Sequence, residues 1–408
     1  MSDQQPDRKR SGFKETTRVA AARDRLRDAV SGHERTESIP LNAADGRALA
    51  EEVVAPRNVP DFPRAAMDGY AVRARDTFGA SGRSPEVLRR ADEMAPGAAV
   101  RVHTGSEVPE GADAVVMVEH ADEFGGDVEV FDAVAEGENV APVGEDVDAG
   151  QSLYDPGHRL RPSDLGMLKS VGVREVTVYD RPRVAVIPTG EELVESDPDP
   201  GEAVETNGLT VSRFVERWGG EATYRDAVTD DEDALREAVE SHLDHDVVVT
   251  TGGSSVGERD LLPEVVSEMG EILVHGVALK PGHPVALGIV DGTPVVMLPG
   301  YPVACIVNAV QFLRPALKRV GHLPLEAMPT ATARLGRKIR SEPGVRSFVR
   351  VGLTDEGDEE RVATPTRASG SGVLSSVALA DGWVEVSEER EGIPEGETVE
   401  VANWEWSA

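Results

Sequence analysis

Several residue types are scarce in this 408-residue chain. It has one cysteine, Cys305, only six lysines among its 42 basic residues, and 4% aromatic residues. A single cysteine excludes an intrachain disulfide framework, which suits a reducing compartment. The sequence has no run of about 18 apolar residues that could span a membrane, and its polar N-terminus lacks an apolar signal core. We therefore expect a cytoplasmic protein, with Cys305 a small core residue of an apolar helix.

Clusters of metal-binding side chains are also lacking. No group of Cys and His residues has the spacing of zinc ligands. His242 and His245 are three residues apart but have no companion ligands, so we expect two surface histidines rather than a metal site.

The acidic residues outweigh the basic ones, and the net charge is −32. The acids are spread along the whole chain, and arginine is favoured over lysine. This pattern indicates adaptation to a high-salt cytoplasm, in which screening relieves self-repulsion. The alternative is an acidic surface that meets a basic partner. Nucleic acid is not an expected ligand because no basic face is evident.

One window departs from this acidity. Residues 331–350 carry six basic side chains against one acid, Glu342; the six are Arg334, Arg337, Lys338, Arg340, Arg346 and Arg350. A basic stretch on so acidic a chain suggests that something negative binds there. Intramolecular pairing with the acidic majority is the other interpretation.

Residues 183–320 show the clearest pattern of secondary structure. Apolar strands are predicted at 183–188, 223–228, 246–251, 271–279, 285–290 and 294–298. Between and after them, apolar residues recur with helical spacing, and Thr229 with Glu232 has the spacing of a capping box. Such alternation predicts a doubly wound α/β domain.

The flanking regions have different patterns. Residues 326–408 contain short alternating runs broken by Gly, Pro and acidic turns, which predict a small β-barrel or sandwich. Residues 57–138 are also strand-like and rich in glycine, and residues 11–31 have a weakly helical pattern. We therefore expect a multidomain protein with both α/β and β parts.

Ligands of open α/β sheets bind beyond the carboxyl ends of the strands. Three loops here follow strands and precede helices, at 188–192, 250–260 and 298–302. In the second, glycines allow close backbone approach, serines supply hydroxyl donors, and the next helix presents free N–H groups. The segment 250–257 (TTGGSSVG) is therefore predicted to cradle an anion, although a tight structural turn would also explain it.

Charged residues surround that loop in the sequence. Lys280 can neutralise a phosphate as a compact charge, and a carboxylate beside a phosphate makes a Mg²⁺ site. The alternatives are a solvated surface position for Lys280 and a helix N-cap for Asp260. A further string, AMDGYAV around Asp68, could be a hairpin turn built on Asp-Gly.

Taken together, these strings resemble the molybdopterin molybdenumtransferases, the MoeA family shared with the C-terminal part of gephyrin. The matching segments run in order through residues 35–405. They are PRAAMDGYAVR (63–73), VRVHTGSEVPEGADAVVMVE (100–119), VGEDVDAGQSLYDPGHRLRPSDLGMLKSVG (143–172), VAVIPTGEEL (184–193), TNG (206–208), TTGGSSVGERD (250–260), LKPGHPVALG (279–288) and LPGYPVA (298–304).

The resemblance implies four domains. They would be an elongated linker and dimerisation domain (10–56 and 139–179), an inserted β-rich domain (57–138), the α/β molybdopterin-binding domain, similar to MogA (180–325), and a C-terminal β-barrel (326–408). It also implies an elongated homodimer whose active site is shared between the α/β domain of one subunit and the inserted domain of the other.

The implied reaction inserts molybdate or tungstate into adenylylated molybdopterin, with Mg²⁺, and releases AMP. Molybdopterin adenylyltransferase and molybdopterin synthase are implied as partners. Positions matching the family's functional acids are Asp68, Asp146, Asp230 and Asp260; Asp68, Glu191 and Asp260 are the implied metal ligands. The implied substrate-binding residues are Thr104, Thr189, Gly190, Glu191, Asn207, Gly252, Gly253, Ser254, Ser255, Lys280, His283, Pro299, Gly300, Arg350 and Ser371.

Two positions depart from the family pattern. His283 replaces a lysine in KPGHP, which makes the charge there depend on pH, and Val345 occupies a place often held by arginine, for which Arg346 could compensate. Two other functions would fit the same α/β domain, namely an ATP-dependent molybdopterin adenylyltransferase and a non-catalytic scaffold. The AMDGYAV segment and the C-terminal barrel favour metal insertion, and the retained Asp68, Asp146, Asp260 and Lys280 argue against a purely structural role.

Overall fold

The computed structural model describes residues 16–252, 261–356, 360–366 and 370–406. The chain divides into two compact units, one formed by residues up to 37 together with 179–408, the other by 38–178. Within the described ranges, no helix combines the length and apolar character needed to cross a membrane.

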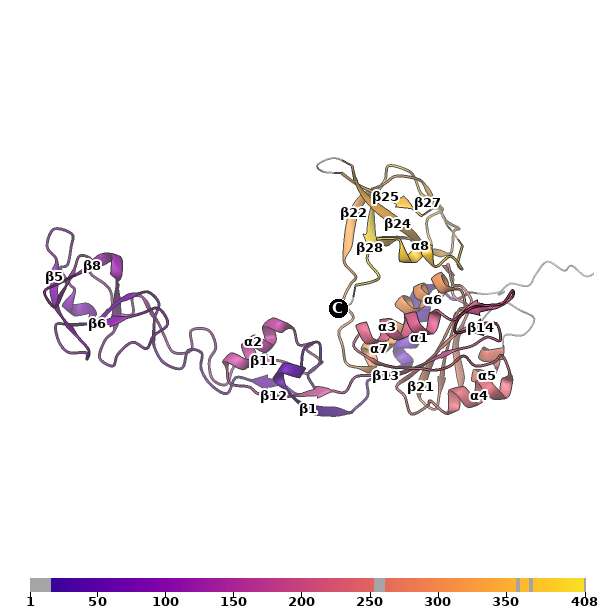
Figure 1. Cartoon of the computed structure of the whole chain (residues 1–408), viewed down its shortest axis with the longest axis horizontal. Helices are drawn as coiled ribbons and strands as arrows, with labels where there is room; N and C mark the ends of the chain where they lie inside the picture. Colours follow the sequence, from indigo (N-terminus) through magenta and orange to yellow (C-terminus); the bar gives the residue numbers. More distant parts are fainter. Residues whose placement is uncertain (1–15, 253–260, 357–359, 367–369, 407–408) are drawn as a thin grey trace, which may run out of the picture. The chain divides into compact units, whose positions relative to one another are not determined.

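The first unit contains a six-stranded sheet in the order β16-β13-β17-β21-β20-β18. Its strands are β13 (Arg183–Pro188), β16 (Glu221–Tyr224), β17 (Val247–Thr251), β18 (Glu271–His275), β20 (Ala286–Val290) and β21 (Thr293–Leu298). Strands β13 and β21 are labelled in Figure 1. β13, β16, β17 and β21 are parallel, whereas β20 runs antiparallel to both of its neighbours. The sheet of the predicted doubly wound domain is therefore mixed, because one of its strands runs antiparallel.

A two-residue turn explains the antiparallel strand. Asp291 and Gly292, which join β20 to β21, have φ values of 48° and 85°. Two successive positive φ values are the conformation of a type I′ hairpin turn, for which Asp-Gly is a preferred pair.

Helices cover both faces of the sheet, as the alternation of strands and helices predicted. On one face, Val247 and Val249 of β17 belong to the same apolar cluster as α1 (Val19–Ala29), α3 (Asn207–Arg217), α6 (Pro302–Asn308) and α7 (Arg314–Val320). On the other, Val248 packs with α4 (Glu232–Glu240) and α5 (Leu261–Met269). Successive side chains of the strand thus enter different cores, which is why it is apolar throughout.

Three local predictions concern Cys305, the start of α4 and the position of α1. Cys305 lies buried in α6, as expected, and burial raises the pKa of its thiol. The N-cap of α4 is Asp231, whose carboxylate accepts a hydrogen bond from the Ala234 amide at 3.1 Å, so the capping box expected at Thr229 is wrong. α1 packs on the α/β core, whereas the sequence interpretation grouped it with the linker residues 10–56.

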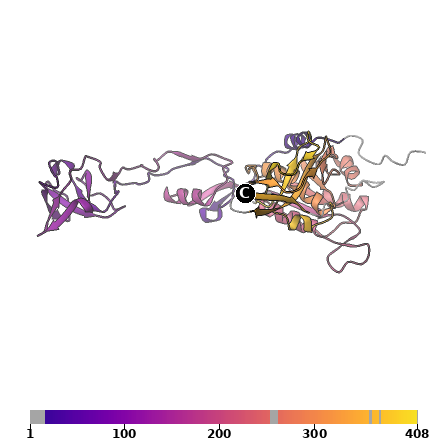
Figure 2. The ribbon, with the colours of Figure 1, turned by 90° about the horizontal axis from the view of Figure 1, so that it is seen from above.

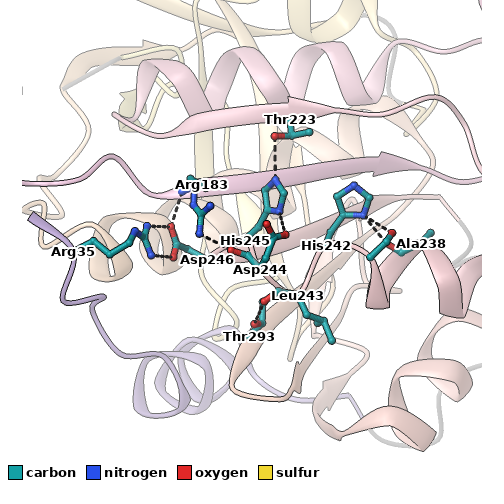
Figure 3. Close-up of polar contacts among 11 residues, drawn as sticks. Arg35, Arg183, Thr223, Ala238, His242, Leu243, Asp244, His245, Asp246 and Thr293 are labelled. Atoms are coloured by element: carbon teal, nitrogen blue, oxygen red, sulfur yellow. Dashed lines mark hydrogen bonds and ion pairs between the residues drawn. The ribbon is translucent and has the colours of Figure 1, made fainter.

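The amino ends of the central strands are held by polar contacts (Figure 3). Asp246, just before β17, accepts two hydrogen bonds from Arg35 at 2.8 and 2.6 Å and one from the Arg183 amide at 2.7 Å. Burial opposes its charge, but these hydrogen bonds outweigh that effect and lower the pKa of Asp246. This edge lies opposite the carboxyl ends at which ligands are expected.

The two histidines near this edge have structural roles (Figure 3). A ring nitrogen of His245 lies 3.0 Å from the Thr223 hydroxyl, and the Nδ1 atom of His242 lies 2.8 Å from the Ala238 carbonyl oxygen. His242 is buried, so the expectation of two surface histidines is wrong for that residue.

The C-terminal strands form a closed barrel in the order β24-β25-β22-β28-β26, with β26 pairing back onto β24. They are β22 (Thr330–Leu335), β24 (Arg346–Glu356), β25 (Glu360–Pro365), β26 (Gly382–Val386) and β28 (Thr398–Ala402). Two short strands, β23 (Ile339–Arg340) and β27 (Gly392–Ile393), pair beside it, and α8 (Ser375–Ala378) lies in the connection from β25 to β26.

One strand connects the barrel to the α/β domain. The predicted strand 271–279 is in fact two strands, because β18 ends at His275 and β19 (Leu279–Lys280) leaves the α/β sheet. β19 pairs in parallel with β24, with Lys280 opposite Ser347. Lys280 is thereby placed at the barrel, which its position in the sequence did not reveal.

The second unit contains a six-stranded sheet in the order β7-β4-β6-β5-β9-β8, within the violet part of the ribbon in Figure 2. The strands are β4 (Gly69–Val72), β5 (Glu86–Ala91), β6 (Ala98–Val102), β7 (Ala114–Met117), β8 (Ala121–Phe124) and β9 (Asp127–Val130). Tyr70, Leu88 and Val116 lie in its core.

The rest of this unit is built from short pairings around a small apolar core. β2 (Val53–Val54) pairs with β11 (Ser152–Tyr154), β3 (Arg64–Ala65) with β10 (Val140–Ala141), and β1 (Thr36–Pro40) with β12 (Glu175–Tyr179). The helix α2 (Pro162–Ser170) begins with the Asp164 carboxylate accepting from the Arg161 amide at 2.9 Å, which satisfies a free N–H group of the first turn.

Candidate functional site

Three strand ends of the α/β domain meet at one edge, as parallel strands require. The Thr189 amide donates to the Thr251 carbonyl at 3.1 Å, and the Gly252 amide donates to the Leu298 carbonyl at 3.0 Å. The predicted loops after β13, β17 and β21 therefore start side by side.

Gly252 allows the central loop to leave this edge. Its φ is +117°, and a Cβ atom there would lie 2.1 Å from the Thr189 carbonyl oxygen. A Cβ atom on Gly300 would lie 3.4 Å from the Gly252 Cα atom. The glycine is thus required for the close approach of the Thr189 backbone, whereas the predicted approach to a ligand stays a prediction. Gly253, Ser254, Ser255 and Asp260 lie outside the described residues, so the anion cradle itself stays a prediction.

Three buried hydroxyl groups lie at these strand ends. Those of Thr189, Thr250 and Thr251 have no hydrogen-bond partner in the structure as far as it describes the chain. A buried hydroxyl without a partner is costly and calls for a physical explanation. The described residues supply no such partner.

Asn207 is connected to the third loop. It is the first residue of α3, and its side-chain amide donates to the Gly300 carbonyl at 2.6 Å. The carboxylate of Glu205 accepts from the Gly208 amide at 2.7 Å and from the Tyr224 hydroxyl. Burial and this carboxylate raise the pKa of Tyr224. Sequence reasoning missed Glu205 and Tyr224; the acid three residues before Gly208, at the helix start, was the available signal.

An acidic group lies beside the first loop. The Gly190 amide donates to the Val228 carbonyl at 3.0 Å, so Glu191 and Asp230 come from adjacent segments. Partial burial raises the pKa of Asp230, and repulsion from Glu192 and Glu191 adds to the effect. Over the described part of the chain, no three Cys, His, Asp or Glu side chains form a ready metal site.

A basic pocket of about 570 Å³ lies between the α/β domain and the barrel. Its walls come from 280–283, from the barrel strands and from the loop that contains Ser371. Five lining side chains carry a permanent positive charge: Lys280, Arg337, Lys338, Arg340 and Arg350. Among the residues that the structure describes, no Asp or Glu lines the pocket, although the chain carries a net charge of −32.

The α/β side of the pocket presents Lys280 and His283. The Lys280 ammonium group lies 2.8 Å from the Glu342 carboxylate. Partial burial lowers the pKa of His283, and the nearby charge of Lys280 lowers it further. Between them, a Cβ atom on Gly282 would lie 2.1 Å from the Asn308 amide nitrogen, which donates to the Gly282 carbonyl at 3.0 Å. The tight packing fixes this wall.

The barrel side presents Arg350, with 6% of its surface exposed. Burial lowers the pKa of its guanidinium, which donates to the Ser376 hydroxyl at 3.3 Å. Ser371 also lines the pocket, and its carbonyl accepts from the Val303 amide at the start of α6. The structure therefore brings Lys280, His283, Arg350 and Ser371 together.

Arg346 does not belong to this group. It is held by Glu388 at 2.8 Å and Glu385 at 2.9 Å and does not line the pocket. It pairs within the molecule. Within the basic window, Arg350 lines the pocket, as the anion-binding interpretation requires, whereas Arg346 pairs with acids of the same chain.

In the other unit, the Asp68 carboxylate is exposed but held in place. Its Oδ1 atom accepts from the Thr104 amide at 2.7 Å and from the Thr104 hydroxyl at 2.8 Å. These hydrogen bonds lower the pKa of Asp68 to about 2. Gly69 begins β4, and a Cβ atom there would lie 1.9 Å from the Val116 carbonyl oxygen. The hairpin interpretation of Asp-Gly is therefore wrong: the glycine makes room for the neighbouring strand.

His103 and Asp146 are the other residues of interest in this unit. The Nδ1 atom of His103 lies 3.5 Å from the second carboxylate oxygen of Asp68, an approach that sequence reasoning missed. Asp146 is exposed, and its backbone amide donates to the Val59 carbonyl at 2.9 Å. No contact between Asp146 and Asp68 is seen in the described residues.

Three family descriptions match successive parts of the chain. They are the MoeA N-terminal region (domain I and II) over residues 17–172, a probable molybdopterin binding domain over 185–319, and the MoeA C-terminal region (domain IV) over 332–404.

Individual relatives match over nearly the whole chain. A molybdopterin molybdenumtransferase of Haemophilus influenzae is 30% identical over 392 residues, covering 93% of this chain and 96% of that protein. Molybdopterin molybdenumtransferase 2 of Mycobacterium tuberculosis is 35% identical over 77% of this chain and 82% of its own length. A crystal structure of the molybdopterin biosynthesis MoeA protein of Pyrococcus horikoshii is 32% identical, with a TM-score of 0.82 over 95% of this chain and all of that one.

Proposed function

This chain belongs to the MoeA family, and we propose that it inserts molybdate or tungstate into adenylylated molybdopterin and releases AMP. It is a transferase of molybdenum cofactor biosynthesis.

The basic pocket carries the proposal. A cavity of about 570 Å³ with five permanent positive charges, on a chain of net charge −32, suits a compact oxyanion or a phosphate group. Arg350 is buried and offers planar guanidinium donors, Lys280 offers a mobile ammonium group, and Ser371 lies in the same wall. We assign these residues, with His283, to holding the oxyanion.

The edge at β13, β17 and β21 is assigned to the pterin adenylate. Thr189, Gly190, Gly252, Pro299 and Gly300 form its floor, and Asn207 holds the Gly300 carbonyl. Three threonine hydroxyls that have no partner among the described residues also lie at this edge. Gly253, Ser254 and Ser255 are proposed to complete the cradle around a phosphate.

The acids fit a Mg²⁺ ion by their chemistry. Asp68 is ionised and exposed, with one oxygen held by Thr104, and Asp230 and Glu191 repel each other where a cation would relieve the repulsion. Carboxylate oxygens are the ligands that Mg²⁺ takes. Asp68, Glu191 and Asp260 are proposed to hold the ion, which would neutralise phosphate charge when bound; Asp146 and Asp230 are proposed to orient water or the oxyanion.

We further propose a cytoplasmic homodimer in which Asp68 serves a site on another copy of the chain, adapted to high salt, with molybdopterin adenylyltransferase and molybdopterin synthase as partners. Complementation tests the shared site. Asp68→Asn and Lys280→Gln chains should each be inactive alone. After denaturation and refolding as a mixture, activity should return only if the two residues act across subunits; no recovery in proven heterodimers contradicts sharing.

The main test follows AMP. Purified protein in molar KCl is incubated with adenylylated molybdopterin, Mg²⁺ and molybdate or tungstate, and AMP release is measured by chromatography. Release that requires the oxyanion is the expected result. No oxyanion-dependent release refutes the transferase assignment, and consumption of ATP with free molybdopterin would indicate an adenylyltransferase.

A further inference from the structure

The pocket contains a contact that its oxyanion function does not explain. Lys280 Nζ lies 2.8 Å from Glu342 Oε1, and both side chains are well exposed, at 61% and 66%. Lys280 lines the pocket whereas Glu342 does not. Glu342 is also the one acid of the basic window 331–350. The hydrogen bond from Lys280 lowers the pKa of Glu342, so the carboxylate is ionised at neutral pH.

The backbone fixes Glu342 at this place. Its carbonyl accepts from the Val345 amide at 3.1 Å, and Gly344 has a φ of +84°. With Pro343 at the second position, Glu342 to Val345 forms a type II turn. The residue before the turn is tied to β24, because the hydroxyls of Ser341 and Ser347 lie 2.8 Å apart.

The lysine is fixed from the other side. Lys280 is in β19 and lies opposite Ser347 in the pairing of β19 with β24. Ser347 therefore anchors the segments that carry both charges. The ion pair follows from the register of two strands and one tight turn, and not from a chance meeting of long side chains.

We propose that Glu342 is a built-in competitor of the oxyanion, which pairs with Lys280 and weakens anion binding. The inference rests on the proposed function, since it requires that the pocket binds an oxyanion. An exposed pair of this kind is weak, so an incoming dianion can displace the carboxylate from the ammonium group. The remaining carboxylate charge then repels the dianion, although Lys280 still attracts it.

The consequence is a tuned affinity. Without Glu342, the full charge of Lys280 would be available to the first anion that enters, including abundant phosphate. With it, weakly held anions must displace a local carboxylate before they gain the lysine. We expect removal of the carboxylate charge to tighten binding of any dianion by about three- to ten-fold, as one unit charge at a solvated site allows.

Glu342→Gln tests this directly in the full chain, with tungstate as the probe in isothermal titration. Glu397→Gln is the matched control, because it removes a carboxylate from a barrel ion pair, with Arg390 at 2.8 Å, outside the basic pocket. Three- to ten-fold tighter binding in the first variant and none in the second is expected. Unchanged binding, or equal tightening in both, overturns the proposal.

A double-mutant cycle distinguishes competition for Lys280 from a general effect of the Glu342 negative charge on anion binding. If Glu342 acts through Lys280, the gain from Glu342→Gln should shrink in a Lys280→Gln background; an undiminished gain contradicts the competition. Wild-type protein that binds no tungstate would refute the oxyanion pocket and the inference together, whereas wild-type binding that Glu342→Gln leaves unchanged refutes the inference alone.

Discussion

Gly252 offers a severe test of how the ligand edge is built. An alanine there places Cβ 2.1 Å from the Thr189 carbonyl oxygen, and real Cβ atoms essentially never come closer than 3.0 Å. Strand ends in the tight centre of the sheet would have to move by about 1 Å. The φ of +117° adds backbone strain of about 1–3 kcal/mol. With the overlap included, we expect Gly252→Ala to destabilise the α/β domain by about 2–5 kcal/mol.

Hydrogen exchange of the β17 amides measures this domain alone, which matters because a multidomain chain need not unfold in one step. A loss of about 2–5 kcal/mol corresponds to exchange faster by about 30-fold or more. Two controls separate the causes. Gly292→Ala isolates the backbone strain, because Gly292 has a φ of +85° but no atom lies within 4 Å of an added Cβ. Gly300→Ala adds a Cβ at the same edge without overlap, because its nearest neighbour would lie at 3.4 Å. If Gly252→Ala destabilises the α/β domain no more than Gly292→Ala does, the argument is refuted.

Three further outcomes are expected. Asp68→Asn should abolish AMP release with little change in thermal stability, because the residue is exposed; marked unfolding would instead indicate a structural role. Tungstate affinity should fall as pH rises from 5.5 to 8. Binding a dianion raises the lowered pKa of His283, so that the imidazole is protonated at low pH, whereas the neutral imidazole at high pH attracts the dianion less. This pH dependence should vanish in His283→Lys. Asp246→Asn should cost about 2–4 kcal/mol of stability at pH 7. Since the folded pKa of Asp246 is lowered, its contribution is present above the unfolded value and should disappear as pH falls through the folded one, in thermal melts from pH 7 to 3.

The sequence predicted the α/β core well because its signals are local. Strands such as β13 and β17 are apolar on both faces, and helices such as α3 show a clear apolar stripe. The antiparallel direction of β20 was missed, because an apolar run does not record which neighbour it pairs with. Only the Asp291-Gly292 turn carried that information, and it was not used.

For the candidate site, the sequence predicted individual residues but not which of them meet, because the contacts join segments that are distant in the sequence. Lys280 and Arg350 were predicted to bind an anion, but the pocket that they share depends on β19 crossing to β24. Arg346 looked equivalent to Arg350 in the sequence, yet Glu388 holds it away from the pocket. The competing carboxylate of Glu342 likewise follows from strand register, which a pattern of residues does not encode.

The position of bound tungstate tests the central claim most directly. Tungsten scatters anomalously, so a crystal of the full chain soaked in tungstate would locate the ion without assumptions about activity. The account predicts a tungsten peak within hydrogen-bonding reach of Arg350, Lys280 and Ser371. A peak elsewhere on the chain, with this pocket empty at the same tungstate concentration, would contradict it.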